Sequence, residues 1–342
     1  MLRLKREFLR PRNWQMVLNY IGSKRTLASR IIAEFQKEWP DLSGTDFVDA
    51  FAGTGAIALA AAPHMRSLTV NDWEDFSVAV LKAQFNPPPN PLALINQLDQ
   101  TLPTTGLITN TYSEHVNRMY FTTLNAQRID GIREALRSPN YTTVERDYLR
   151  GSLVAAADTV ANVASVYGAY LKEFKNTATN LLHLRVIPPS SRKATVLQMD
   201  TQQLVLDPTY ITPETLLYLD PPYNQRQYGA NYFPLNAVAD IHADTLDVNG
   251  ITGIPADGYK KSVWCSKKTV AQALKTVLEG TPARRLALSY NREGLLTHEE
   301  IGALFAATEW QFKRVEIPYK RFASQRDLEA NTTEYLFIAE RI

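Results

Sequence analysis

Short apolar runs recur near both ends of the chain, and most of them stop at an acidic or amide residue. Helical patterns follow most of these runs, including an alanine-rich stretch that ends at Ala62 and the segment Thr297–Ala306. This alternation is typical of a mostly parallel sheet that is covered by helices on both faces. The runs are Asp46–Phe51, Leu68–Val70, Thr195–Met199, Thr215–Leu219 and Arg285–Ser289.

Two further runs, Phe312–Pro318 and Glu334–Glu340, leave no room for a helix between them and predict an antiparallel pair at the edge of the sheet. Together the runs predict an α/β fold with a doubly wound, mostly parallel, seven-stranded sheet. Acids and small polar residues gather at the carboxyl ends of the runs. Open α/β sheets bind their ligands at that edge, so we expect the functional site there.

Residues 86–189 differ from the rest of the chain, because long helical patterns replace the alternation and no run of comparable clarity appears. The most notable helical patterns cover Ala126–Leu136 and Val144–Phe174. These features predict a helical insertion at 86–189 within a domain made of residues 1–85 and 190–342.

A second stretch, Asn224–Lys268, contains turn signals but little apolar periodicity, and it is predicted to be irregular. Its lysine pairs, Lys260-Lys261 and Lys267-Lys268, flank Trp264. They would either contact nucleic-acid phosphates or form ordinary solvated surface. The net charge of +2 does not distinguish these two roles.

The composition is that of an ordinary globular protein, with 342 residues, 45% hydrophobic and 21% charged. No apolar run approaches the roughly 20 residues needed to span a bilayer, and the basic start lacks the apolar core of a secretory signal, so no membrane attachment is expected. The single cysteine, Cys265, excludes an intramolecular disulfide and fits the cytoplasm. Five scattered histidines offer no metal-ligand spacing, so no metal site is expected.

The first candidate site lies where the run Asp46–Phe51 enters a turn with Gly53 and Gly55 and then a helical pattern. Glycines let the backbone approach a ligand without a Cβ clash. The turn lacks the third glycine of a dinucleotide loop and the lysine of a phosphate loop, which favours an uncharged nucleoside over a polyphosphate. At the end of the next run, the Asp72 carboxylate would bind the two hydroxyls of a ribose or cap a helix, or do both.

The segment Asp220-Pro221-Pro222-Tyr223 follows an apolar run, so the Asp220 carboxylate would lie at the carboxyl edge of the sheet. The prolines lack N–H donors, which leaves their carbonyl oxygens as acceptors. A carboxylate and a carbonyl can accept both hydrogens of an aromatic amino group, whose lone pair is then free to attack a methyl sulfonium. Tyr223 offers a face on which a base taken out of a duplex could stack. A simple proline-rich turn is the alternative.

Together these residues resemble the adenine-specific (N6) DNA methyltransferases, in particular the Dam-like branch and the methylases of type IIS restriction-modification systems. The family pattern D-x-F-x-G-x-G is matched by Asp49, Phe51, Gly53 and Gly55, and the catalytic motif D-P-P-Y by Asp220, Pro221, Pro222 and Tyr223. The resemblance implies a Rossmann-like methyltransferase fold, S-adenosylmethionine as the cofactor and flipping of the target adenine.

The resemblance also implies which residues bind the cofactor. Asn19–Lys24 is similar to the N-terminal segment of the family, Asp72 to the acid after its second strand, and Asp200 to the residue near the adenine of the cofactor. The implied cofactor-binding residues are Tyr20, Gly22, Lys24, Asp49, Phe51, Gly53, Gly55, Asp72 and Asp200.

In that family the target-recognition region lies between the second and third strands, where residues 86–189 stand here. The resemblance therefore implies that this insertion contacts double-stranded DNA. Asn224–Tyr228 and Asn231-Tyr232 are similar to the loop that follows the catalytic motif in restriction-associated members, and Asn331–Phe337 is similar to the last strand of the family. A restriction-modification or phage-defence role, with a cognate restriction endonuclease as a partner, is a further implication.

Three alternatives stay open from the sequence. An RNA adenine methyltransferase would use the same chemistry on a different polymer. A protein glutamine methyltransferase has a similar layout but typically has Asn where Asp220 stands. An inactive DNA-binding subunit is the third, although Asp220, Gly53 and Gly55 are intact.

Overall fold

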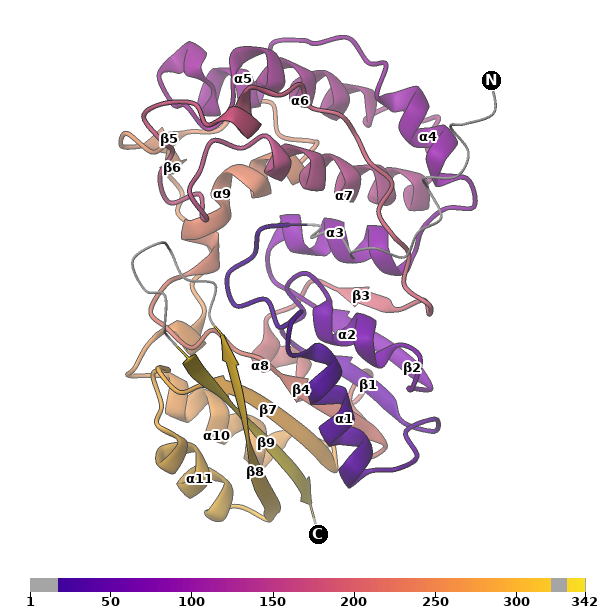
Figure 1. Cartoon of the computed structure of the whole chain (residues 1–342), viewed down its shortest axis with the longest axis vertical. Coiled ribbons are helices and arrows are strands. Elements are labelled where there is room, and N and C mark those ends of the chain that lie inside the picture. Colours follow the sequence, from indigo (N-terminus) through magenta and orange to yellow (C-terminus); the bar gives the residue numbers. More distant parts are fainter. Residues whose placement is uncertain (1–17, 321–330, 342) are drawn as a thin grey trace.

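The computed structural model describes residues 18–320 and 331–341 (Figure 1). The basic start of the chain lies outside these residues. A seven-stranded sheet has the order β3-β2-β1-β4-β7-β9-β8, in which only the pairings of β9 are antiparallel. The predicted α/β fold, including the antiparallel pair at the edge, is confirmed. The strands are β1 (Asp46–Asp49), β2 (Ser67–Asn71), β3 (Thr195–Leu197), β4 (Thr215–Leu219), β7 (Arg285–Asn291), β8 (Trp310–Lys320) and β9 (Asn331–Arg341).

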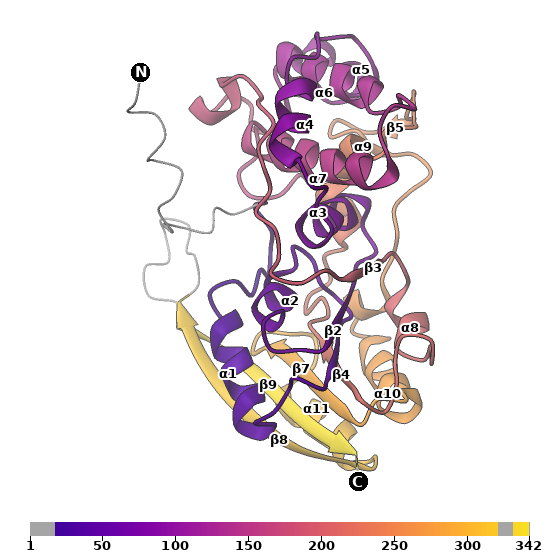
Figure 2. The same cartoon turned by 90° about the vertical axis from the view of Figure 1, so that its right-hand side faces the viewer.

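Residues of the central strand β4 alternate between two hydrophobic cores, one on each face of the sheet. Leu216 and Tyr218 lie in the first core, whereas Leu217 and Leu219 lie in the second. Neighbouring residues of a strand point to opposite faces, so one continuous apolar run contributes to both cores. Figure 2 shows the sheet between its two helical layers. The first core is covered by α1 (Ala28–Glu38) and α2 (Ala56–Ala61), and the second by α8 (Thr201–Leu204), α10 (Val270–Gly280) and α11 (His298–Ala306).

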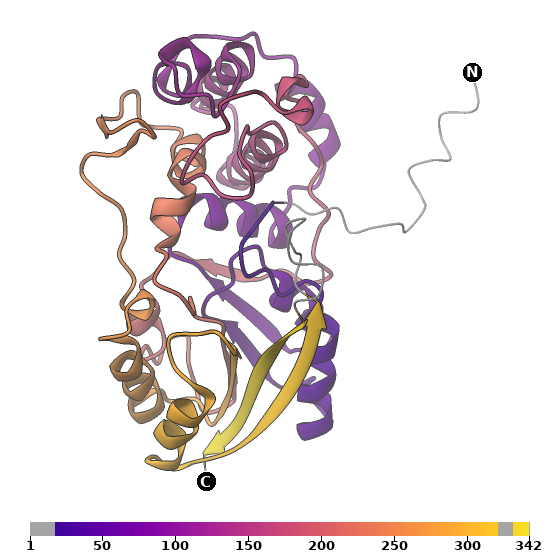
Figure 3. The ribbon, with the colours of Figure 1, turned by 60° about the vertical axis from the view of Figure 1, so that its left-hand side comes forward.

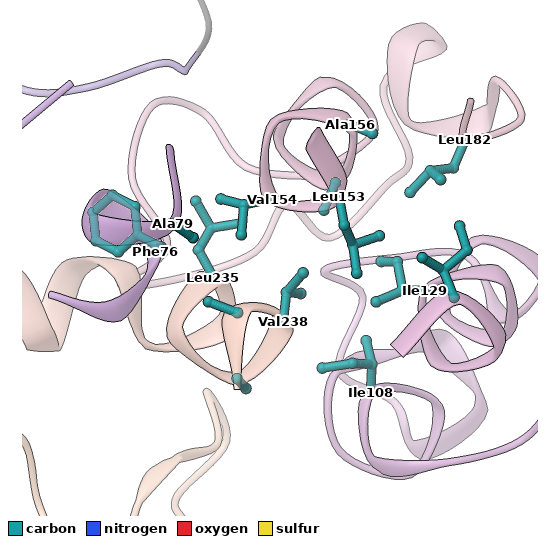
Figure 4. Packing of buried hydrophobic residues seen from close by; sticks show 14 of the residues in the cluster. Phe76, Ala79, Ile108, Ile129, Leu153, Val154, Ala156, Leu182, Leu235 and Val238 are labelled. Carbon is teal, nitrogen blue, oxygen red and sulfur yellow. The ribbon is translucent and has the colours of Figure 1, made fainter. Parts of the chain in front are cut away.

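The remaining helices form a second body above the sheet, called the helical block here (Figures 1 and 3). In its core, Phe76 of α3 and Leu235 of α9 share one cluster with Leu153 and Val154 of α7 (Figure 4). Helices α3 and α9 therefore belong to the block although they lie outside residues 86–189. The block contains α3 (Asp75–Phe85), α4 (Pro91–Leu98), α5 (Leu107–Tyr112), α6 (Thr123–Ala135), α7 (Thr143–Thr159) and α9 (Tyr228–Ala239), with single turns η2 (Glu114–Val116) and η3 (Asn176–Thr179).

The helical pattern Ala126–Leu136 corresponds to α6, but the prediction of one helix over Val144–Phe174 is wrong, because α7 ends at Thr159. Beyond that point the Asn162 amide donates to the carbonyls of Met119 and Leu171, at 3.0 Å each. These bonds hold the chain in an irregular path. Its apolar side chains are still buried in the block, and their spacing along the chain resembles that of a helix.

The prediction that Asn224–Lys268 is irregular is also wrong in part, since the stretch contains α9, the short strands β5 (Val248–Asn249) and β6 (Ile254–Pro255), and the turn η4 (Val263–Cys265). Helix α9 is kinked at Tyr232 and contains Pro234. Most of its side chains are buried, so it shows no amphipathic period. None of the helices in the described part of the chain has the length and hydropathy that crossing a bilayer requires.

Candidate active site

A cavity of about 950 Å³, counting its open mouth, lies at the carboxyl ends of β1, β2 and β4. All of the predicted site residues except Gly55 line it. A Cβ on Gly55 would instead meet Leu81 and Phe85 of α3 at 3.0 and 3.1 Å. Gly55 therefore allows α2 to pack closely on α3, and its contact with the cofactor stays a prediction. The predicted residues in the lining are Tyr20, Gly22, Lys24, Asp49, Phe51, Gly53, Asp72, Asp200, Asp220, Pro221, Pro222 and Tyr223.

The turn after β1 is held by hydrogen bonds from the neighbouring segment after β2. Gly53 has a left-handed φ of +53°, which disfavours any side chain. Its N–H donates to Oδ2 of Asp72 at 2.9 Å, and its carbonyl accepts from the Ser77 hydroxyl at 2.5 Å. The Tyr20 ring covers the glycine so closely that a Cβ would lie 2.7 Å from its Cε1 atom. The turn, the acid and the ring are therefore fixed relative to one another.

Asp72 was predicted to bind a ribose, to cap a helix, or to do both. Its carboxylate accepts from the N–H groups of Gly53 and Glu74, at 2.9 Å each, so it organises both backbone segments. Each carboxylate oxygen can accept more than one hydrogen, so a ligand hydroxyl can still bind to it. Burial raises the pKa of Asp72 to about 6, although the backbone N–H donors oppose the rise.

Asp49 is 1% exposed, and its Oδ1 has no hydrogen-bond partner among the described residues. Burial raises the pKa of Asp49 well above its usual value, and the nearby carboxylates of Asp220 and Asp72 raise it further. A buried carboxylate with an unpaired oxygen is costly unless a ligand completes it. A cationic group would do so.

Asp220, at the end of β4, is paired with a buried lysine. Lys24 Nζ lies 2.8 Å from Oδ1 of Asp220 and 3.2 Å from Oε1 of Glu334 on β9. Burial raises the pKa of Asp220 to about 6; the Lys24 charge opposes this rise and the Glu334 charge adds to it. Burial lowers the pKa of Lys24, but the two carboxylates outweigh burial and hold it well above its usual value. The group therefore carries one positive and two negative charges.

Tyr223 and the prolines continue the wall of the cavity beside this ion group. Lys24 Nζ lies 5.6 Å from the centre of the Tyr223 ring. A Cβ on Gly22 would lie 3.3 Å from the Tyr228 hydroxyl and 3.7 Å from the Tyr223 ring. Gly22 therefore lies against both tyrosines and leaves room between them.

Asp200 begins α8, and its side chain accepts from the Gln202 N–H at 2.7 Å. It lines the cavity, as do Phe51 and Trp264, whose rings meet edge to face at 5.4 Å. Trp264 is not among the predicted site residues, since in the sequence it stands out only by its place between the lysine pairs.

The sequence did not indicate several lining residues, because they belong to the helical block or to the stretch after Asp220–Tyr223. Glu74 accepts from the Asn236 amide at 2.6 Å, and burial raises the pKa of Glu74 to about 7. Tyr228 stacks on Tyr20 at 5.3 Å. No local signal separates these residues from ordinary core. The missed lining residues include Trp73, Glu74, Gln227, Tyr228, Lys260, Trp264 and Cys265.

The helical block also positions the N-terminal segment of the site. The N–H and the amide of Asn19 donate to Asp158 at the end of α7, at 2.8 and 3.2 Å. The Ile21 N–H donates to the Tyr232 hydroxyl at 2.9 Å. The segment that carries Tyr20 is thus anchored on the block, whereas the glycine turn belongs to the sheet.

The chain is similar to known DNA methyltransferases over most of its length. A family model described as D12 class N6 adenine-specific DNA methyltransferase matches residues 20–292. The type II methyltransferase M.CviAII of Paramecium bursaria Chlorella virus 1 is 38% identical over 332 residues, which cover 94% of this chain and 97% of that protein. M.NlaIII of Neisseria lactamica is 33% identical, covering 95% and 99%. M.FokI of Planomicrobium okeanokoites is 30% identical, covering 95% of this chain and 53% of that protein.

Proposed function

Because this chain belongs to the D12 class of N6 adenine-specific DNA methyltransferases, we propose that its cavity binds S-adenosylmethionine next to one adenine flipped out of double-stranded DNA. The observation that carries this proposal is the position of Asp220, the Gly53 turn and Asp72 in the lining of a single cavity. Methyl transfer requires both reactants in contact, and one cavity at the carboxyl edge of the sheet allows that. Family membership favours DNA over the RNA and protein substrates that the sequence left open.

The lining fits S-adenosylmethionine, which when bound supplies a methyl group on a positively charged sulfonium. Acids outnumber bases in the cavity, which favours a cationic ligand. Tyr20, Gly22, Lys24 and the unpaired oxygen of Asp49 would hold the methionine part beside the Gly53 turn. Asp72 would accept from the ribose, and Phe51 and Asp200 would contact the adenine of the cofactor.

Asp220 and the Pro221 carbonyl would accept the two amino hydrogens of the target adenine, with the base stacked on Tyr223. Lys24 pairs with Oδ1 of Asp220, and 17% of the Asp220 side chain remains exposed to the cavity. Asp220 need not deprotonate the amine first, because an aromatic amine is a very weak acid and its proton can leave after transfer. Positioning and dipoles already in place would provide most of the barrier reduction.

We expect the purified protein to transfer tritium from labelled S-adenosylmethionine to DNA from a host without adenine methylases. Structured RNA at the same concentration should receive none. Sequencing the modified DNA for methyladenine identifies the recognition site in the same experiment. If calorimetry detects no binding of S-adenosylmethionine, the alternative of an inactive DNA-binding subunit replaces this proposal.

Stacking of the target base on Tyr223 has its own test. Tyr223→Phe keeps the ring and should retain most activity, whereas Tyr223→Ala should lose roughly 10- to 100-fold, because stacking on an aromatic ring contributes about 1–3 kcal/mol per base. Single-turnover rates with saturating DNA compare the two variants. Equal rates would count against stacking.

We also propose that residues 86–189 of the helical block contact DNA and that the protein acts in restriction-modification, as the names of its relatives suggest, with a cognate endonuclease.

In each lysine pair, one lysine bonds within the protein and the other is exposed. Lys260 donates to the Trp73 carbonyl, and Lys267 donates to the Leu295 carbonyl and pairs with Glu300. Lys261 and Lys268 are exposed and remain available for phosphates.

A further inference from the structure

Glu334 is a buried acid that is not among the predicted site residues. It lies on β9, is 0% exposed and does not line the cavity. Its Oε1 accepts from the Ser289 hydroxyl at 2.6 Å and lies 3.2 Å from Lys24 Nζ. Its Oε2 has no hydrogen-bond partner among the described residues. A carboxylate in this position needs a reason, because burying a charge with an unpaired oxygen opposes folding.

The geometry of the ion group supplies that reason. Lys24 is itself only 5% exposed and lies between two carboxylates, one of which is Asp220. If Lys24 had Asp220 as its sole partner, it would neutralise that carboxylate and compete with the adenine amino group for it. Because Lys24 also pairs with Glu334, its positive charge is shared between two carboxylates. The three side chains together therefore carry one net negative charge next to the cavity.

We propose that Glu334 is a positioning residue for methyl transfer, which holds the Lys24 ammonium between two carboxylates so that Asp220 remains a good acceptor for the adenine amino group and its proton. This inference rests on the function proposed above. Glu334 acts through Lys24 and touches neither substrate.

The charge of the ion group matches the step. The amino nitrogen forms a bond to the methyl carbon while the carbon–sulfur bond breaks, with its electron pair retained by sulfur. The nitrogen then carries a positive charge, and one N–H bond breaks with its electron pair left on nitrogen. Asp220 takes the proton and becomes neutral. A second negative charge near Lys24 raises the affinity of Asp220 for that proton.

The shift in pH dependence is measured against the other groups around Asp220, which are the same residues in the wild type and in Glu334→Gln. Among the described residues, the titratable and charged groups that act on Asp220 include Lys24 from the N-terminal segment, Glu334 from β9, Asp49 from β1, Tyr218 from β4 and Tyr228 from α9. The phenols of Tyr218 and Tyr228 stay neutral, because burial raises the pKa of each well above its usual value.

The test is the pH dependence of the single-turnover rate, with tritiated S-adenosylmethionine and saturating DNA from a methylase-free host. Methyl transfer requires ionised Asp220, so the wild-type rate should fall as pH drops through about 6. In Glu334→Gln the pKa of Asp220 falls, so this acid limb moves to lower pH by about one unit, and the plateau rate drops roughly 10-fold. In Lys24→Gln the pKa rises, so the limb moves to higher pH.

Opposite shifts in these two variants are what a purely structural role cannot produce. Glu340→Gln, the same substitution at a half-exposed residue of β9, should leave the limb in place. Thermal unfolding checks that each variant is folded. If Glu334→Gln does not fold, Glu334→Asp replaces it. Its shorter side chain places the carboxylate farther from Lys24, so the shift should be smaller and in the same direction.

The outcomes separate the two proposals. If the wild type is active but folded Glu334→Gln or Glu334→Asp shows the same pH dependence as the wild type, the role of Glu334 is overturned. The proposed function then stays intact. Wild type that binds DNA but transfers no tritium overturns the proposed function. A third outcome is a roughly 10-fold loss of S-adenosylmethionine affinity in Glu334→Gln with no shift in the pH dependence of the rate. That result would place Glu334 in cofactor binding and would also overturn this inference.

Discussion

Replacing Asp220 by alanine is expected to lower the single-turnover rate of methyl transfer by on the order of 10³-fold, with S-adenosylmethionine affinity close to that of the wild type. The carboxylate is the only charged acceptor that the proposal places on the adenine amino group. The cofactor would be held by other residues, chiefly Asp49, Asp72 and the Gly53 turn. Catalysis and cofactor binding should therefore separate in this variant.

The fold should survive this substitution, because Lys24 keeps Glu334 as a partner at 3.2 Å. Rapid-quench assays measure the rate, and calorimetry measures cofactor affinity. Asp220→Asn keeps the shape and one carbonyl acceptor, so its loss should be smaller than that of alanine. Asp41→Ala serves as a control, since Asp41 is exposed and accepts from the Ser43 N–H in a turn. Wild-type turnover by Asp220→Ala would show that the catalytic assignment is wrong.

Substituting Gly53 by alanine is expected to weaken S-adenosylmethionine binding by at least about 10-fold, which corresponds to roughly 1.4 kcal/mol. Two effects act together. The left-handed φ of +53° costs an L-residue about 1–2 kcal/mol. The new Cβ would also lie 2.7 Å from Cε1 and 2.9 Å from Cζ of the Tyr20 ring.

Tyr20 cannot simply move aside. Its ring stacks on Tyr228 and Tyr232 at 5.3 and 5.6 Å, and it packs on Phe76 at 6.2 Å. The clash should therefore displace the turn, the ring or both from the proposed cofactor site, and calorimetry with S-adenosylmethionine measures the loss of affinity.

Gly44→Ala is the matched control, because a Cβ there would meet nothing within 4 Å. It should bind the cofactor as the wild type does and unfold at the same temperature. Unimpaired binding by a folded Gly53→Ala variant would contradict the role given to the turn.

Much of the sheet and several parts of the site could be predicted because their signals are local. The run Thr215–Leu219 is a strand with the predicted bounds, and it is continuously apolar because its side chains alternate between two buried cores. Asp220 follows it directly, so the carboxylate had to lie at the carboxyl edge of the sheet. Gly53 could be predicted for the same reason, since a turn between strand and helix is a property of neighbouring residues.

Gly55 shows the limit of such local reasoning. Its place in the motif predicts a contact with the cofactor, which stays a prediction, but does not predict that a Cβ on Gly55 would meet Leu81 and Phe85 of α3, which comes later in the chain. Helix α9 could not be predicted from apolar spacing, because it is buried on most sides and contains Pro234. Whether a glycine faces a ligand or a helix depends on what packs against it.

The sequence by itself determined the α/β class, the strands and the motifs that end them, because backbone periodicity and turn chemistry depend on residues close together along the chain. Only the tertiary structure decided which charges meet. Lys24, Asp220 and Glu334 come from an N-terminal segment, a central strand and an antiparallel strand near the C-terminus, and no local pattern links them. Their coupling arises because the sheet brings distant segments into a buried space, where charges interact strongly over a few ångströms.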